Sequence, residues 1–414
     1  MLDRLTIERM EAADEDGPVL VAFSGGGDST ALLLLLAERL GASRLRGAVV
    51  DHALRTGSAD EAKSAVQFAE SHDIRTDLLT VEWAAQQTRS QETAREARHR
   101  ALYRAARRCG AHVIALGHTA DDQAETVLMR AAAGSAWRGL AGIAPLAPAP
   151  IWPEGRGLII ARPLLGARRQ QLRTLLADRR FGWLDDPSNK NVAYERVRIR
   201  ARLAELERAG LDAMALRRLA QRMRAVADNV DAAAVALINR AAGFETGAIS
   251  LDRGAWDADA AVRERALTVL ICAASGEPRA PAPDAAARLE TRMREAEFRG
   301  ATLGGAALSL RRGRILITRD SGALLGRAGG GEPMPPLRLP AGEELVWDGR
   351  LALTASASGV VVYADGSTPR IEAPNNATVA THWLLAERVE HMLGVAKRSE
   401  VPQKAANEIN TPKP

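Results

Sequence analysis

The N-terminal half of the chain alternates short apolar runs with longer amphipathic or charged stretches. Four runs have the length of buried strands: Val19–Phe23, Gly47–Asp51, Ile74–Val81 and Val113–Leu116. Helical patterns follow them in turn, at Asp28–Leu40, Ser58–His72, Glu92–Cys109 and Ala120–Ala133. This alternation is typical of βαβ units, so the sequence predicts an α/β fold: a parallel sheet with helices on both faces.

The patterning after residue 140 is weaker. A long amphipathic helix is expected at Leu211–Asn239, opening an α-rich second domain. Hairpins are expected at Ala307–Arg319 and Leu345–Thr354. Pro- and Gly-rich segments indicate a loop and two linkers: Leu146–Gly157, Gly276–Asp284 and Gly329–Pro336. The pattern fades beyond Gly366, and Ala405–Pro414 is interpreted as a loose tail. The predicted domains are therefore 1–205, 206–328 and a partly β C-terminal region, 329–414.

Polar clusters follow three of the predicted strands: Ser24–Ser29, Asp51–Arg55 and His118–Glu125. In a parallel sheet the ligand crevice lies at the carboxyl ends of the strands. This coincidence predicts a binding site at that edge of the sheet.

The first cluster is the loop Ser24-Gly25-Gly26-Gly27-Asp28-Ser29-Thr30. Glycines let a backbone approach a phosphate closely, and a helix start offers free N–H groups and a positive dipole end. Asp28 would repel phosphate unless a cation lies between them, so the loop also predicts Mg²⁺. The loop is neither a Walker loop nor a dinucleotide fingerprint, because Gly-Lys-Ser/Thr and the third glycine are missing. The alternative is an ordinary helix cap by Ser24 or Asp28.

His118, Asp122 and Glu125 share one helical face through their spacing. An imidazole beside two carboxylates can hold a metal or a cationic amine, and it can shuttle a proton. Thr119 with Asp122 also fits a capping box, so a structural role is the alternative, and for Asp121 it is the favoured one.

Two further stretches contain arginines that are candidate functional residues. In one, Arg95 and Arg98 share a helix face with Glu92, where they can clamp phosphate, stack on a base or merely form solvated salt links. In the other, every second residue is an arginine: Arg196, Arg198 and Arg200. Successive members cannot both be buried, so we expect some of them to face RNA phosphates.

In order and spacing, these groups resemble the motifs of the tRNA(Ile)-lysidine synthases, a family of PP-loop ATP pyrophosphatases. The glycine loop is similar to the SGGxDS loop of that superfamily. Residues 117–126 resemble its GHxxDDxxET run, and residues 51–55 resemble a D-H-x-L-R run. Further similarity lies at Arg162-Pro163-Leu164-Leu165 and at Trp183–Asn189. The stretch Ala133–Leu140 departs from the family by lacking an arginine and a glycine, for which Arg138 is a partial substitute.

The resemblance implies a nucleotide alpha hydrolase-like fold and a two-step reaction. ATP with Mg²⁺ adenylates the C2 oxygen of the wobble cytidine in tRNA(Ile) with a CAU anticodon, and L-lysine then displaces AMP to give lysidine. The implied catalytic residues are Asp28, His118, Asp122, Glu125 and Arg98. The implied ATP-binding residues are Ser24, Gly25, Gly26, Gly27, Asp28, Ser29 and His52, with Asp28 also at the metal. The implied tRNA contacts are Arg95, Arg138, Arg196 and Arg200.

Composition narrows the class of protein. The 414 residues are 46% hydrophobic and 26% charged, as in ordinary globular proteins. The chain has 56 basic and 51 acidic residues, a net charge of +5, and only five of the basic residues are lysines. This charge permits a nucleic-acid partner without requiring one. The two cysteines lie far apart, which excludes a disulfide scaffold or a four-cysteine metal site within the chain. No apolar run approaches the ~20 residues of a membrane span, and the acidic N-terminus is unlike a signal peptide. We expect a cytoplasmic protein without a membrane partner, and a homodimer is left open.

Three other functions share part of this pattern. A tRNA thiolation enzyme would need paired cysteines, and an amidotransferase-type ligase would need a glutaminase part with a nucleophilic cysteine. A nucleotide-sensing binding protein would need the phosphate loop but not His118, Asp122 and Glu125 together.

Overall fold

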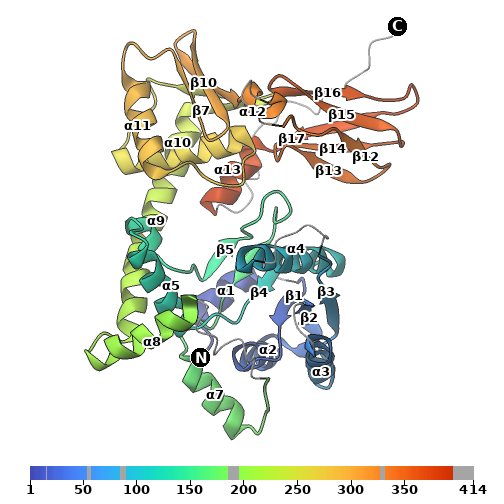
Figure 1. Cartoon of the computed structure of the whole chain (residues 1–414), viewed down its shortest axis with the longest axis vertical. Helices are drawn as coiled ribbons and strands as arrows, with labels where there is room; N and C mark the ends of the chain where they lie inside the picture. Colours follow the sequence, from blue (N-terminus) through green and yellow to red (C-terminus); the bar gives the residue numbers. More distant parts are fainter. Residues whose placement is uncertain (15, 54–56, 84–89, 185–194, 327–331, 395–414) are drawn as a thin grey trace. The chain divides into compact units, whose positions relative to one another are not determined.

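The structure is a computed structural model of the chain. It describes residues 1–14, 16–53, 57–83, 90–184, 195–326 and 332–394. The chain divides into two compact units, Met1–Ala227 and Asp228–Pro414 (Figure 1). The boundary falls within helix α9 (Ala213–Ala241), so the three-domain division stays a prediction.

A six-stranded sheet forms the centre of the first unit, in the order β3-β2-β1-β4-β6-β5. The four predicted strands are all present: β1 (Val19–Phe23), β2 (Leu45–Asp51), β3 (Thr76–Thr80) and β4 (Val113–Ala115). They pair in parallel with one another and with β6 (Ile159–Ala161). β5 (Leu146–Pro148) adds an antiparallel edge within a segment that we expected to be only loop, so that expectation was wrong there.

Helices cover both faces of this sheet, which confirms the predicted α/β class. The predicted helices form within two residues of their expected ends: α2 (Gly27–Leu40), α3 (Ser58–Glu70), α4 (Gln91–Cys109) and α5 (Ala120–Ala132). Val19, Val21 and Phe23 of β1 pack against α2, α3, α1 (Arg4–Ala13) and α7 (Arg169–Asp178). The alternating residues Leu20 and Ala22 face α4 on the other side, as the period of two in a strand requires.

A second small core holds the helices beyond the sheet. Residues of α5, of α8 (Glu195–Arg208) and of the start of α9 pack together in it: Ala124, Val127, Leu203, Ala213, Leu216 and Ala220. The four-residue helix α6 (Trp137–Leu140) follows α5. The long amphipathic helix expected at Leu211–Asn239 is therefore confirmed as α9, two residues further along.

The second unit contains the expected helical region and a sheet that the sequence analysis did not predict as a whole. Its helices are α10 (Ala260–Ser275), α11 (Pro283–Arg294) and α12 (Ser321–Leu325). The sheet runs β7-β8-β11-β10-β9, with β7 (Ala242–Glu245), β8 (Ala248–Asp252), β9 (Gly300–Leu303), β10 (Ala306–Arg311) and β11 (Arg314–Arg319). The β10–β11 pair is the predicted hairpin. The linker expected at Gly276–Asp284, inside the second domain, joins α10 to α11, which share one core.

Two three-stranded sheets and a helix end the described chain. One sheet joins β12 (Leu337–Leu339), β15 (Val360–Asp365) and β16 (Thr368–Glu372). The other joins β13 (Glu344–Trp347), β14 (Leu351–Ala355) and β17 (Val379–Trp383), and its β13–β14 pair is the second predicted hairpin.

Beyond Gly366, where the sequence pattern fades, the structure has three further elements that were not predicted: β16, β17 and α13 (Leu385–Leu393). The strand β16 pairs only with β15 and exposes every second residue, so its sequence is too polar to resemble a strand. The first three residues of the linker expected at Gly329–Pro336 and all of the tail Ala405–Pro414 fall where the structure gives no description. None of the described helices combines the length and hydropathy needed to cross a membrane.

Candidate active site

The glycine loop forms the turn between β1 and α2. Gly25 has φ +76°, a conformation that favours glycine. Gly26 is the N-cap of α2 and offers no side chain to the first-turn N–H groups, so the alternative of a cap by Ser24 or Asp28 was wrong. The Ser29 hydroxyl donates to the Gly26 carbonyl and accepts from the Ser24 amide, which fixes the loop from inside. The helix start therefore keeps N–H groups for an anion.

The segment Trp183-Leu184 packs against this loop. The Leu184 amide donates to the Gly25 carbonyl at 2.8 Å, and the two segments form a parallel bridge. A Cβ on Gly25 would lie 2.7 Å from Leu184 Cδ1, so the close approach requires glycine. The Trp183 ring lies against Gly27 in the same way, because a Cβ there would be 3.5 Å from the indole. The rest of the Trp183–Asn189 motif lies outside the described residues.

Helix α5 begins with the predicted cap and carries Asp122 and Glu125. His118 precedes the helix, so the expectation that it shares their helical face was wrong. Thr119 and Asp122 form a complete capping box, in which Asp122 Oδ2 accepts from the Thr119 amide and hydroxyl at 2.8 Å each. Asp122 Oδ1 points elsewhere and accepts from Arg169 Nη2 at 3.0 Å. Asp121 accepts from Arg168 Nε and from the Arg169 amide, which matches the structural role favoured for it.

Arg169 is the main residue that the sequence analysis missed. Its Nε lies 3.0 Å from Asp28 Oδ2, and its Nη1 lies 3.6 Å from Glu125 Oε1. Together with the Asp122 contact, one guanidinium thus joins the glycine loop to α5. We call Asp28, Asp122 and Glu125 the acid cluster. The signal in the sequence was a pair of arginines shortly after Arg162-Pro163-Leu164-Leu165, at the first turn of α7.

Two of the arginines expected at RNA also face the acid cluster. Arg200 Nε donates to Glu125 Oε1 at 2.6 Å, and Arg196 Nη1 lies 4.0 Å from Asp122 Oδ1. They are one helical turn apart on α8, so both point the same way. Arg198 lies on another side of the helix and is exposed, which confirms that successive members of the run are not both buried.

Burial and arginine contacts have opposite effects on the carboxyl pKa values of the acid cluster. Burial raises the pKa of Asp28 despite Arg169, and it raises the pKa of Glu125 despite Arg200. Burial also disfavours ionisation of Asp122, but Arg169, His118 and the Thr119 hydrogen bonds outweigh it and lower the pKa of this carboxyl. Within the described part of the chain, Asp28 Oδ1 and Glu125 Oε2 are buried and have no hydrogen-bond partner.

Burial and nearby arginine charges set the protonation state of His118. Burial and the charges of Arg162, Arg98 and Arg95 lower the pKa of His118 to about 3, although Asp122 opposes them. His118 is therefore neutral at pH 7, which makes it a hydrogen-bonding group rather than a charged one. Burial and Arg98 also lower the pKa of His52, whose carbonyl accepts from Trp83 Nε1. Leu54 and Arg55 of the second cluster lie outside the described residues.

The comparisons with known proteins identify the family. A family model described as a PP-loop domain matches residues 3–207. A tRNA(Ile)-lysidine synthase of Hyphomonas neptunium is 42% identical over 316 residues, covering 75% of this chain and 83% of the relative. The chain belongs to the tRNA(Ile)-lysidine synthase family. The relative of that name from Mesorhizobium japonicum is 39% identical and covers 83% of this chain and 74% of its own length. A third, from Caulobacter vibrioides, is 35% identical, with 91% and 84% covered.

The family resemblance and the ATP-binding PP-loop fold predicted from the motifs are thereby confirmed. The stretch Ala133–Leu140, which was expected to depart from the family motif, follows α5 and includes the short helix α6. Arg130 donates to the carbonyls of Gly139 and Gly142 and so ties α6 to α5. Arg138, on α6, is half-buried.

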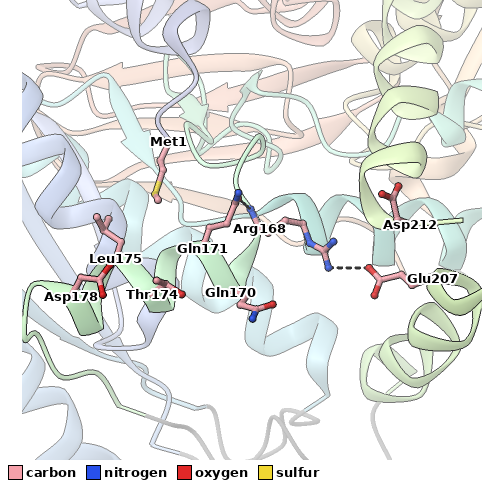
Figure 2. Close-up of a pocket in the computed structure, with 9 residues that line it drawn as sticks. All are labelled: Met1, Arg168, Gln170, Gln171, Thr174, Leu175, Asp178, Glu207 and Asp212. Carbon is pink, nitrogen blue, oxygen red and sulfur yellow. Dashed lines mark hydrogen bonds and ion pairs between the residues drawn. The ribbon is translucent and has the colours of Figure 1, made fainter. Parts of the chain in front are cut away.

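One described pocket of this lysidine synthase homologue lies apart from the predicted site residues. It has a volume of about 760 Å³ and lies beside α7, where the Arg168–Glu207 ion pair crosses it (Figure 2). Its lining residues are Met1, Arg168, Gln170, Gln171, Thr174, Leu175, Asp178, Glu207 and Asp212. None of the predicted site residues is among them, so the candidate active site is the glycine loop with the acid cluster.

Proposed function

We propose that this chain ligates L-lysine to C2 of the wobble cytidine of tRNA(Ile) with a CAU anticodon, at the expense of ATP. The observation that carries the proposal is that Arg169 joins the anion-binding loop to Asp122 and Glu125 in one ion-pair network. A site for nucleotide phosphates and a site for a cationic amine are thus adjacent. The name of the relatives, tRNA(Ile)-lysidine synthase, supports the substrate and the product.

The glycine loop would serve the first step. The cytidine C2 oxygen attacks the α-phosphate of ATP, and the bond to pyrophosphate breaks. N–H groups at the start of α2 hold phosphate oxygens where negative charge develops. Ser24, Ser29 and the three glycines line the path of the phosphates, and His52, at the end of β2, lies on the adenosine side. Arg98 and the neutral His118 face the reacting base.

Asp28 fits a Mg²⁺ ion that arrives with ATP. Mg²⁺ prefers oxygen ligands and keeps several waters, so one protein carboxylate can suffice. The buried, unpartnered Oδ1 of Asp28 is such a ligand. When bound, Mg²⁺ supplies positive charge that stabilises the leaving pyrophosphate.

The acid cluster would serve the second step. The lysine ε-amine forms a bond to C2, the C2–O bond to AMP breaks, and the amine loses a proton. Asp122 has a lowered pKa and stays ionised, so it attracts the ammonium form. Glu125 has a raised pKa, which makes it the better proton acceptor.

Arginines on the surface of the same unit would hold the tRNA. We assign phosphate contacts to Arg95, which is exposed, and to Arg138. Arg196 and Arg200 are also proposed contacts, and their ion pairs to the acid cluster would then link tRNA binding to the site. The logarithm of tRNA affinity should fall linearly with the logarithm of salt concentration, and less steeply when Arg95 is removed. The proposed setting is the cytoplasm, and a homodimer is tested by light scattering of the purified chain.

Two variants test the proposal. Asp28→Ala should abolish pyrophosphate release from ATP and tRNA while the chain stays folded, as measured by circular dichroism. Glu125→Ala should weaken the use of lysine more than the binding of ATP. Unchanged pyrophosphate release in the first variant, or equal losses for lysine and ATP in the second, would contradict the assigned roles.

A further inference from the structure

Arg169 binds each member of the acid cluster through one oxygen. It donates to Asp28 Oδ2 and Asp122 Oδ1, and it lies 3.6 Å from Glu125 Oε1, which also accepts from Arg200 Nε at 2.6 Å. The second oxygen of Asp122 is used by the helix cap. The second oxygens of Asp28 and Glu125 are the buried acceptors that have no partner in the described part of the chain.

We propose that Arg169 is a positioning residue shared by the two halves of the site. It holds one oxygen of Asp28 and, together with Arg200, one oxygen of Glu125. The other oxygen of each carboxylate is thereby presented to a cation: the metal of ATP at Asp28 and the substrate amine at Glu125. This inference rests on the proposed function and adds to it a residue that acts on both ligands.

The planar guanidinium suits this task. It offers five N–H groups in a fixed fork, so it can hold carboxylates in defined directions, whereas a lysine ammonium is a point charge. The carboxylates repel one another, since Asp122 disfavours ionisation of both Asp28 and Glu125. A cation between them therefore keeps the acid cluster together before any ligand arrives.

Arg169 is itself held firmly. It is the first residue of α7, and its amide donates to Asp121 Oδ2 at 2.7 Å, which anchors it to the start of α5. Leu172 and Leu176 of α7 are fully buried in the core that α2 shares. The guanidinium thus has a fixed origin relative to both helices whose acids it contacts.

Its neighbour Arg168 provides a matched control. Arg168 has the same charge and also pairs with two acids, but these are Asp121 and Glu207, outside the acid cluster. A general loss of helix anchoring should appear in variants of either arginine. A loss of ligand positioning should appear only in variants of Arg169.

The test measures binding by the full chain without turnover. Equilibrium dialysis gives the affinity for L-lysine in the presence of α,β-methylene-ATP, and titration gives the Mg²⁺-dependent affinity for that analogue. Arg169→Gln should weaken both affinities at least tenfold, and Arg168→Gln should change each by less than threefold. Arg169→Lys keeps the charge needed for folding but not the fork, and it should still weaken both affinities at least threefold.

Three results would overturn the role. It is wrong if Arg169→Lys binds either ligand within threefold of the wild type, if Arg169→Gln weakens only one of them, or if Arg168→Gln weakens both as much. A wild-type chain that binds no lysine would instead overturn the proposed function, and the role of Arg169 with it. Failure of the two claims is therefore distinguishable.

Discussion

Replacing Asp122 with asparagine separates its structural task from its functional one. Both oxygens of the carboxylate accept hydrogen bonds. Oδ2 accepts from the amide and hydroxyl of Thr119, and Oδ1 accepts from Arg169. Asparagine has one side-chain oxygen and one NH₂ group. The NH₂ group must therefore face either the Thr119 donors or the Arg169 donor, and the hydrogen bonds on that side are lost. Loss of the arginine contact costs about 1.5–3 kcal/mol, and loss of the cap costs about 0.5–2 kcal/mol. We therefore expect Asp122→Asn to lower the free energy of unfolding by about 2 kcal/mol in urea denaturation.

Asp121→Asn is the matched control for this variant. Asp121 also accepts on both oxygens, from Arg168 Nε and the Arg169 amide, so its stability loss should be similar. Its side chain does not belong to the acid cluster. Asp122→Asn should raise the KM for lysine about tenfold or more, the equivalent of one charged hydrogen bond, while Asp121→Asn should change it less than about threefold. Equal effects of the two variants on the lysine KM would refute the assignment of Asp122 to the amine.

Three further predictions address the loop, the buried histidines and the metal. Gly25→Ala should cost about 1–2 kcal/mol of unfolding free energy because of its positive φ and its contact with Leu184, whereas Gly26→Ala, at φ −68°, should change it by less than ~0.5 kcal/mol. Equal costs for the two would contradict the loop geometry. Burial and the charges of Arg95, Arg98 and Arg162 lower the pKa of His99 to about 4. Between pH 6.5 and pH 4 the unfolded chain thus binds a proton that the folded chain does not, and stability falls as the pH falls. His99→Phe keeps a ring beside Tyr103. Between pH 7 and pH 5 this variant should lose about 2 kcal/mol less unfolding free energy than the wild type, as measured by urea denaturation. An equal loss in the two proteins would be inconsistent with a buried neutral His99. EDTA should stop pyrophosphate release and Mg²⁺ should restore it, and release that continues in EDTA would show that Asp28 has no metal to hold.

Local patterns sufficed where a feature depends on neighbours in sequence. Three of the four strands were predictable because each is a short apolar run, and β3 because its segment is rich in leucine and threonine. The α5 cap was predictable because Thr119 and Asp122 are three residues apart. The placement of Asp28, His118 and Asp122 at one sheet edge followed from the rule that parallel strands share their carboxyl ends. The motifs also supplied the family, which the relatives confirm.

Features that depend on contacts between distant residues were not predictable. Arg169 meets acids whose positions precede it by more than forty residues, and no periodic pattern indicates such a contact. The neutral state of His118 likewise depends on arginines brought from α4 and from the end of β6. In the second unit, β7, β8 and β9 were missed because none of them is a continuous apolar run: their sequences AGFE, AISLD and GATL mix small, polar and apolar residues.

The central claim is best tested by measuring AMP formation from ATP by the purified chain. The assay compares tRNA(Ile) bearing a CAU anticodon with tRNA(Met), each with and without L-lysine. The account predicts AMP release that requires both lysine and tRNA(Ile), with lysine incorporated into the tRNA. AMP formation that is independent of lysine, or equal with tRNA(Met), would contradict it.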